Sequence, residues 1–134
     1  MAERLSRNPI HLGLGATAEV QPDFTGEMGW YEAYGSRHGG DGIEGRLVTM
    51  HTFGESWDMW EMHPSGSEVV LCEAGSIELV QEIDGSSIAT TLEVGEYAIN
   101  APGVWHTANV EGEATCVFIT AGAGTQHRER TMNE

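Results

Sequence analysis

Apolar and polar residues alternate with a period of two through much of the second half of the chain. Between residues 76 and 83, Ile77 and Leu79 share one face of the segment while Glu78 lies on the other, as in a half-buried strand. Asp84-Gly85 then supplies a hairpin turn of a favoured type. Similar patterns predict further strands over residues 45–53, 57–63, 68–73, 88–92, 96–99, 104–110 and 114–121. Strands this short, separated by frequent glycines, indicate an antiparallel sandwich or barrel, not long helices.

The 134 residues divide into three parts on this pattern. Residues 1–25 carry few periodic signals and contain Pro9 and Pro22, so we expect an N-terminal arm there. Residues 26–121 make up the predicted barrel, and residues 122–134 a polar, exposed tail. This length suits one domain built around a single hydrophobic core.

The composition is strongly acidic, with 21 acidic against 6 basic side chains and a formal net charge of -15. Such a surface repels phosphate backbones and anionic headgroups, so we expect no binding of nucleic acid or membranes. The chain begins without an apolar signal core, which predicts a cytoplasmic location. Cys72 and Cys116 lie in apolar, strand-like segments, where free cysteines pack as small hydrophobes. Neither requires an oxidising compartment.

Two short segments bring together side chains that bind metals. In a strand over residues 57–63, Glu61 and His63 lie on one face, so two donors converge from one rigid element. After a Pro-Ser-Gly turn the next strand opens with Glu68, which a hairpin would place beside His63. A later Pro-Gly turn leads into His106. Two imidazoles and two carboxylates form a mixed site that suits a divalent transition metal such as Fe, Mn, Ni, Co or Zn.

These segments resemble the two motifs of the small single-domain cupins. The matching positions are His63, Glu68 and Gly75 for the first motif, and Gly95, Gly103 and His106 for the second. The resemblance covers roughly residues 54–110 and implies an all-β, antiparallel double-stranded β-helix, the RmlC-like jelly-roll barrel, preceded here by an arm. One departure matters for the chemistry, because Glu61 stands where the family usually has the first histidine of its first motif.

The four candidate ligands allow two arrangements. Either Glu61, His63, Glu68 and His106 all bind the metal, or three of them bind and Glu61 acts as a catalytic general base. An octahedral ion held by four protein ligands keeps two positions for water or substrate.

The remaining candidates concern the pocket wall. Met59, Tyr97, Ile99 and Val104 are predicted to surround the metal as an apolar wall. His51 lies on a strand with apolar neighbours, so packing or pocket lining is favoured over ligation. The other histidines, His11, His38 and His127, lie in poorly patterned segments and are expected to be solvated.

Large apolar residues also occupy the face opposite the candidate ligands. Trp60 and Met62 alternate with Glu61 and His63, so they point out of the barrel. An isolated barrel would leave them exposed to water. A second copy of the chain is the expected cover, with the N-terminal arm over part of the same sheet, and a homodimer is therefore predicted.

Three functions remain open from the sequence. The first is a metal-dependent enzyme acting on a small carbonyl, enol or sugar-like substrate, of isomerase or lyase type or of dioxygenase type. The second is a non-catalytic cupin that binds or senses a small molecule and has lost or weakened its metal. The presence of Glu61 in place of the first motif histidine supports this function. A purely structural dimer is disfavoured, because converging polar groups inside a barrel cost free energy unless they are used.

Overall fold

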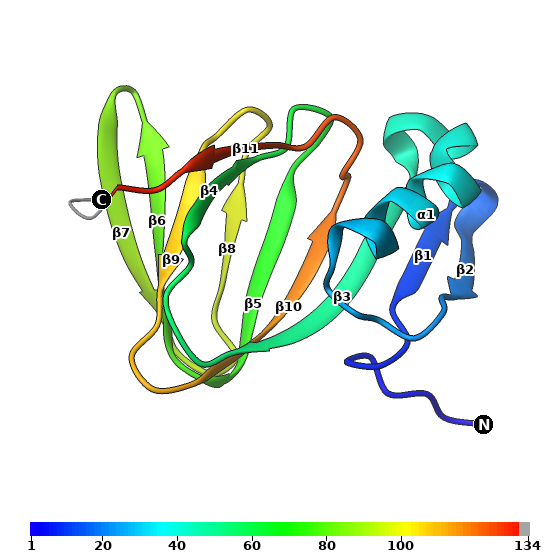
Figure 1. The fold of residues 1–134 in the computed structure, drawn as a ribbon, viewed down its shortest axis with the longest axis horizontal. Helices are drawn as coiled ribbons and strands as arrows, with labels where there is room; N and C mark the ends of the chain where they lie inside the picture. The colour runs from blue at the N-terminus through cyan, green and yellow to red at the C-terminus, as the bar shows by residue number, and fades with distance from the viewer. Residues whose placement is uncertain (132–134) are drawn as a thin grey trace.

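Two antiparallel sheets make up most of the computed structural model, which describes residues 1–131 (Figure 1). The larger sheet has the strand order β2-β1-β3-β10-β5-β8, with β1 at Ile10–Gly13, β2 at Thr17–Val20, β3 at Arg46–Phe53, β5 at Glu68–Gly75, β8 at Tyr97–Asn100 and β10 at Ala114–Thr120. The smaller sheet has the order β11-β4-β9-β6-β7, with β4 at Met59–Met62, β6 at Ile77–Ile83, β7 at Ser86–Leu92, β9 at His106–Asn109 and β11 at Gln126–Glu129. The strands predicted between residues 45 and 121 are confirmed.

The hairpin between β6 and β7 shows how local sequence fixes register. Ile83 and Ser86 are paired across the turn, and the two residues between them, Asp84 and Gly85, have positive φ angles of 51° and 80°. This is the conformation of the two-residue hairpins that match the twist of the strands, and Asp-Gly adopts it readily.

The hydrophobic core lies between the sheets. Its buried members are Val70, Cys72, Ile77, Leu92, Ala108, Val110, Ala114 and Cys116. Both cysteines are free and fully buried, as predicted. Along β5 the inward positions read Glu68, Val70, Cys72, so the inward row that builds the core ends on a buried carboxylate. That end of the barrel carries the candidate site.

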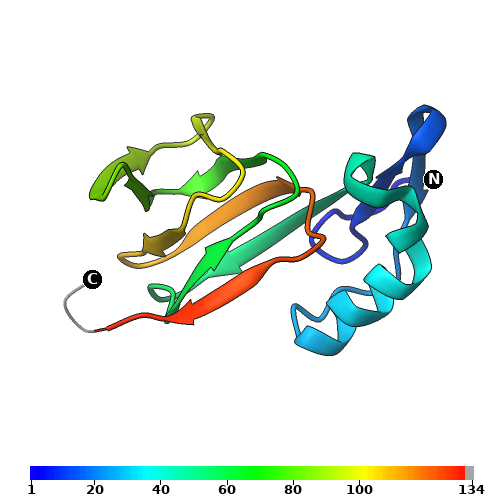
Figure 2. The same cartoon turned by 90° about the horizontal axis from the view of Figure 1, so that it is seen from above.

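The N-terminal arm is more structured than its sequence indicates. β1 and β2 form a hairpin, and β1 pairs with β3, which extends the larger sheet. The chain then forms a helix, α1, at Met28–His38, followed by short helical turns, η2, at Gly39–Glu44. Seen from above, α1 lies at the N-terminal end of the molecule beside the sheets (Figure 2). The sequence patterns did not predict α1, because this helix is short and only weakly periodic. No helix of residues 1–131 is both long and apolar enough to span a membrane.

The predicted tail contains the strand β11, which pairs with β4. Arg128 of this strand lies over the rings of Trp60 and Trp105, 4.8 and 4.9 Å from their centroids. Trp60 is consequently only 1% exposed within the single chain. The expectation that a second copy must cover it is corrected, since the C-terminal strand of the same chain provides a cover. A cation over two indole faces is attractive in itself, by about 0.5–1 kcal/mol for each contact.

Candidate metal centre

The four residues expected to bind a metal meet at one end of the barrel. Glu61 of β4 and His106 of β9 face each other across paired strands, Glu68 opens β5, and His63 follows β4 directly. The His63 Nε2 atom lies 3.1 Å from Glu68 Oε2 and 3.9 Å from Glu61 Oε1. The His106 Nε2 atom lies 3.2 Å from Glu68 Oε1. The strand and turn pattern of the sequence therefore predicted which side chains converge.

The outer hydrogen bonds of the two imidazoles determine where their protons lie. Thr125 donates its single hydroxyl proton to the Gly122 carbonyl at 2.8 Å, so the same oxygen accepts from His63 Nδ1, also 2.8 Å away. His106 Nδ1 lies 3.2 Å from the Val104 carbonyl, which can only accept. Each neutral ring thus carries its proton on Nδ1 and directs an unprotonated Nε2 at the carboxylates, as metal-binding histidines do.

Neither Nε2 atom has a hydrogen-bond partner among the described residues, although both are buried. The Glu68 oxygens lie 3.1 and 3.2 Å from them but form no hydrogen bond with either. A nitrogen lone pair that faces a carboxylate oxygen is repelled by it, unless a proton or a cation lies between them. Single ligand atoms of Glu61, His63 and His106 lie within 4.8 Å of one another. This donor set could hold a divalent transition metal.

Glu68 is fixed by neutral donors from the larger sheet. Asn100 Nδ2 donates to its Oε1 at 3.0 Å, and the Thr120 hydroxyl donates to its Oε2 at 2.6 Å. Gln81 Nε2 in turn donates to Asn100 Oδ1 at 2.7 Å. Burial acts to raise the pKa of Glu68, but in their protonated form the two neighbouring imidazoles attract this carboxylate, outweigh burial and hold the pKa well below its usual range. The side chain is therefore a charged, oriented carboxylate. None of these three supporting residues stands out in the sequence, because each is an ordinary inward strand position.

Glu61 is more exposed to solvent than Glu68. Its side chain is 30% exposed, and His127 Nε2 lies 3.7 Å from its Oε1 atom. The two residues are paired across β4 and β11. The neighbouring Glu61 carboxylate raises the pKa of His127, against the opposing effect of burial. His127 is exposed, as predicted, but its position beside Glu61 was not predicted, because β11 is too polar to be read as a strand.

The centre opens into a cavity of about 1100 Å³. His51 and Met59 line it, and their role in binding a substrate stays a prediction. Tyr97 and Ile99 do not line it, since they are 63% and 53% exposed on the outer face of β8. The sequence analysis assigned Tyr97 and Ile99 to the inner face of this edge strand. A shift of one residue in a strand exchanges its inner and outer faces, so that prediction was wrong.

Val104 is also absent from the cavity lining among the described residues. It lies in the turn before β9, where its backbone carbonyl orients His106. Its contribution to the site is thus through the main chain, not through an apolar wall.

The cavity extends from the candidate metal centre to the N-terminal elements. Aromatic side chains supply much of its wall: Phe24, Tyr31, Tyr34, Phe53, Trp57 and Phe118. His11 and His38 line its far end. His11 is only 1% exposed, so the expectation of a solvated side chain was wrong. No spacing in the sequence signals this burial, because it depends on α1 folding against β1.

No family model matches the chain, and no curated protein matches it in sequence. Solved structures do resemble it. An uncharacterized conserved protein with a double-stranded β-helix domain from Klebsiella pneumoniae is 24% identical, with a TM-score of 0.52 over 63% of this chain and 76% of that one. An oxalate oxidase is 17% identical, with a TM-score of 0.52 over 60% of this chain and 44% of that one. A cupin-2 domain-containing protein from Shewanella frigidimarina is 20% identical, with a TM-score of 0.47 over 56% and 69%. The two antiparallel sheets and this likeness show that the chain has the double-stranded β-helix fold of the cupins.

Proposed function

We propose that the chain is a metal-dependent enzyme acting on a small substrate with carbonyl, enol or sugar-like hydroxyl oxygens. The observation that carries this proposal is the pair of buried Nε2 atoms of His63 and His106, both without a hydrogen-bond partner among the described residues and both next to carboxylates. A buried polar atom without a partner costs about 1–3 kcal/mol. A bound cation would offset that cost at both atoms and would neutralise the carboxylates.

His63 and His106 would hold the ion together with Glu68, Glu61 or both carboxylates, and this donor set suits Fe, Mn, Ni, Co or Zn in the divalent state. Glu61 either completes the set or stays free to move a proton. Its partial exposure and its distance of 3.7 Å from His127 favour proton transfer at Glu61 Oε1. Thr125 and the Val104 carbonyl would keep both imidazoles in the binding tautomer.

The bound ion would supply stabilisation of negative charge on a substrate oxygen. The protein would do the rest. The aromatic wall of the cavity would exclude water from the substrate. Glu61 would accept a proton from the substrate and pass it on to His127. Isomerase or lyase chemistry and dioxygenase chemistry both need these functions.

Elemental analysis of the purified protein tests the proposal. We expect close to one transition-metal ion per chain. His106→Ala should remove most of it while circular dichroism stays that of a folded β protein. His51→Ala is the matched control, because His51 lines the same cavity outside the ligand set. Wild-type protein that neither contains nor takes up a metal would contradict the proposal.

The occupant then separates the reaction types. Stoichiometric iron together with oxygen consumption on a candidate substrate would indicate a dioxygenase. Manganese or nickel without oxygen consumption would indicate an isomerase or lyase.

A non-catalytic binding or sensing protein is the second candidate. It is favoured by Glu61, which stands where the cupin motif usually has a histidine. This candidate takes the lead if the protein binds small molecules in the cavity but contains no metal.

Homodimer formation and a cytoplasmic location also stay predictions. The apolar side chains that are exposed in the single chain include Tyr97 and Ile99 of the edge strand β8. Packing of the outer face of β8 against the same face of a second copy would cover them. Light scattering after size-exclusion chromatography would report the mass, and Ile99→Lys should lower it if this edge forms the dimer.

A further inference from the structure

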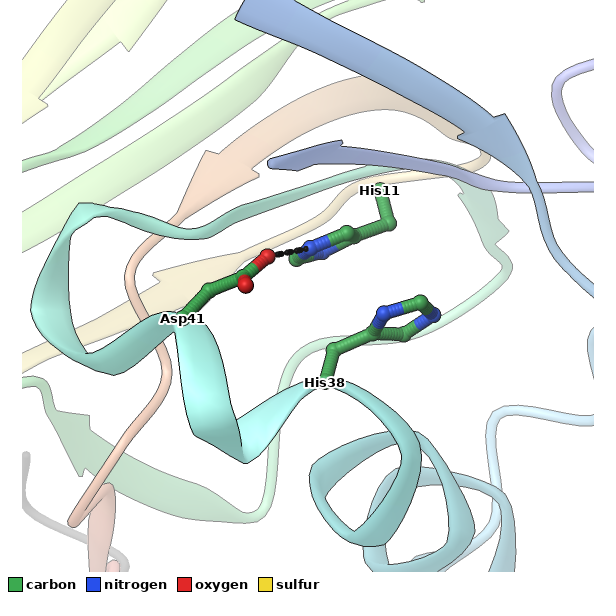
Figure 3. A group of neighbouring side chains, drawn as sticks. All are labelled: His11, His38 and Asp41. Carbon is green, nitrogen blue, oxygen red and sulfur yellow. Dashed lines mark hydrogen bonds and ion pairs between the residues drawn. The ribbon is translucent and has the colours of Figure 1, made fainter. Parts of the chain in front are cut away.

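A second group of polar side chains lies at the far end of the cavity. His11 of β1, His38 at the end of α1 and Asp41 of η2 come together there (Figure 3). The two nitrogens of His11 are both engaged, Nε2 with Asp41 Oδ2 at 2.6 Å and Nδ1 with the Tyr34 hydroxyl at 2.5 Å. The ring of His38 stacks on that of His11, with centroids 3.8 Å apart and planes inclined by 18°.

This geometry does not favour a metal ion. The lone pairs of an imidazole lie in the plane of its ring, so two stacked and nearly parallel rings cannot direct them at one ion. His38 Nε2 in addition lies 3.1 Å from Gln21 Oε1. Since His11 has a partner at each nitrogen, the group is a chain of hydrogen bonds that runs from Asp41 through His11 to Tyr34.

The donors and acceptors in this chain of hydrogen bonds follow from the Asp41 carboxylate at its end. A carboxylate can only accept, so His11 Nε2 donates to it and carries the ring proton. Nδ1 of the neutral ring is then an acceptor, and the Tyr34 hydroxyl donates its single proton to it. The Tyr34 oxygen is left with lone pairs and no proton to give. It can therefore receive a hydrogen bond from a ligand but cannot donate one.

The surrounding glycines indicate that the chain is closely fitted. A Cβ atom at Gly13 would lie 2.9 Å from Asp41 Oδ2, and one at Gly45 would lie 3.1 Å from His11 Cε1. Both glycines have negative φ angles, -104° and -72°, which any residue can adopt. Glycine is needed at these two positions because there is no room for a side chain beside the His11–Asp41 pair. The backbone conformation alone would allow any residue.

We propose that Tyr34, oriented by His11 and Asp41, binds the hydroxyl group of an aromatic or similarly flat apolar ligand. Tyr34 and His11 line the cavity together with the aromatic wall described above, which fits the apolar body of such a ligand. The hydroxyl site stands on its own geometry. That the same ligand also reaches the metal with its other end rests on the proposed function.

Binding of phenol and anisole to metal-free protein tests the site. Phenol can donate a hydrogen bond to Tyr34, whereas anisole is of similar shape and can only accept. We expect the ratio of the anisole Kd to the phenol Kd, measured by calorimetry at pH 8, to fall about two- to tenfold in Tyr34→Phe, the effect of one neutral hydrogen bond. Tyr31→Phe is the matched control, the same change one turn earlier on α1 and in the same cavity.

Asp41→Asn provides a second variant that keeps the shape of the side chain. An amide that donates to His11 Nε2 moves the ring proton to Nδ1, which then donates to Tyr34 and turns its hydroxyl proton toward the cavity. The preference should shift from phenol toward anisole. An unchanged ratio in both Tyr34→Phe and Asp41→Asn, or a change in Tyr31→Phe instead, would overturn the proposal.

The use of metal-free protein separates this inference from the proposed function. A protein that takes up no metal but distinguishes phenol from anisole through Tyr34 retains the hydroxyl site. Conversely, zinc binding by His106→Ala that is abolished by adding Asp41→Ala would show a metal site at the far end and would overturn the inference.

Discussion

Two clusters of histidine and carboxylate occupy the two ends of one cavity, and they differ in how their imidazoles are satisfied. At the barrel end, His63 and His106 donate from Nδ1 to fixed acceptors and leave Nε2 without a hydrogen-bond partner among the described residues. At the arm end, both nitrogens of His11 have partners, and the second ring is stacked on the first. The residue types are the same, but only the first cluster has lone pairs that converge.

The difference shows that composition is a poor guide to a metal site and that the position of the proton is a better one. A histidine whose outer nitrogen is bound to an acceptor and whose inner nitrogen is free is prepared for a cation. A histidine with a hydrogen bond at each nitrogen has no lone pair left for a cation. A carboxylate at one nitrogen then determines whether the group at the other nitrogen donates or accepts. The predictions below test this distinction, beginning with the largest effect.

The two clusters should differ most in how much zinc affinity is lost when one histidine of each is replaced by alanine. His63→Ala should lower the affinity for zinc by at least about a hundredfold, since removal of a supporting residue alone costs 10- to 100-fold. His38→Ala should leave zinc affinity within about twofold of wild type. Isothermal titration with a competing chelator measures both. Equal losses in the two variants would abolish the distinction between the clusters.

Thr125→Val should weaken metal binding by about 10- to 100-fold, because the acceptor that keeps the proton on His63 Nδ1 is lost. The matched control is Ser65→Ala, which removes the hydrogen bond from Ser65 to the Ala123 carbonyl in the same loop. If Ser65→Ala weakens zinc binding as much, loop position and not the tautomer of His63 controls affinity.

Asp41→Ala should lower the free energy of unfolding by about 1–3 kcal/mol, because buried His11 loses its acceptor. Metal content should not change, since the affected bond lies at the other end of the cavity. Urea unfolding of the metal-free protein measures the first effect and elemental analysis the second. Loss of the metal in this variant would mean that the two ends are not independent.

The stability of the metal-free protein should depend on pH through the barrel end. The pKa of His106 is raised because the attraction of Glu68 outweighs burial. The contribution of His106 to folding stability is therefore complete below the ordinary pKa of 6.5 and is lost as the pH rises through the raised pKa. The pKa of Glu68 is lowered, so its contribution is present above the ordinary value of 4.5 and is lost as the pH falls through the lowered pKa. Stability should therefore be greatest between about pH 4.5 and 6.5.

Added metal should extend this maximum to higher pH, because the cation takes over the place of the proton on Nε2. Melting temperatures measured across pH with and without zinc report the change. A maximum that does not move when zinc is added would indicate that the ion does not bind at His106.

Sequence patterns predicted the convergence of Glu61, His63, Glu68 and His106 because each lies in or beside a strand or turn with a strong local signal. They failed at Tyr97 and Ile99, where a strand of four residues gives too little alternation to set its parity. They failed also at Trp60, whose outward direction was right but whose cover, Arg128, comes from a polar segment that became a strand by pairing. Long-range pairing decided both outcomes.

The sequence by itself determined the class of fold, the order of the strands from residue 45 to 121, and the types of side chain that converge at the barrel end. These follow from alternation, turn chemistry and spacing, which act over a few residues. Only the tertiary structure decided which nitrogens carry protons, that His127 lies beside Glu61, and that His11, Asp41 and Tyr34 form a chain at the far end of the cavity. Each of these depends on contacts between segments distant in the chain, and no local pattern encodes the space between them.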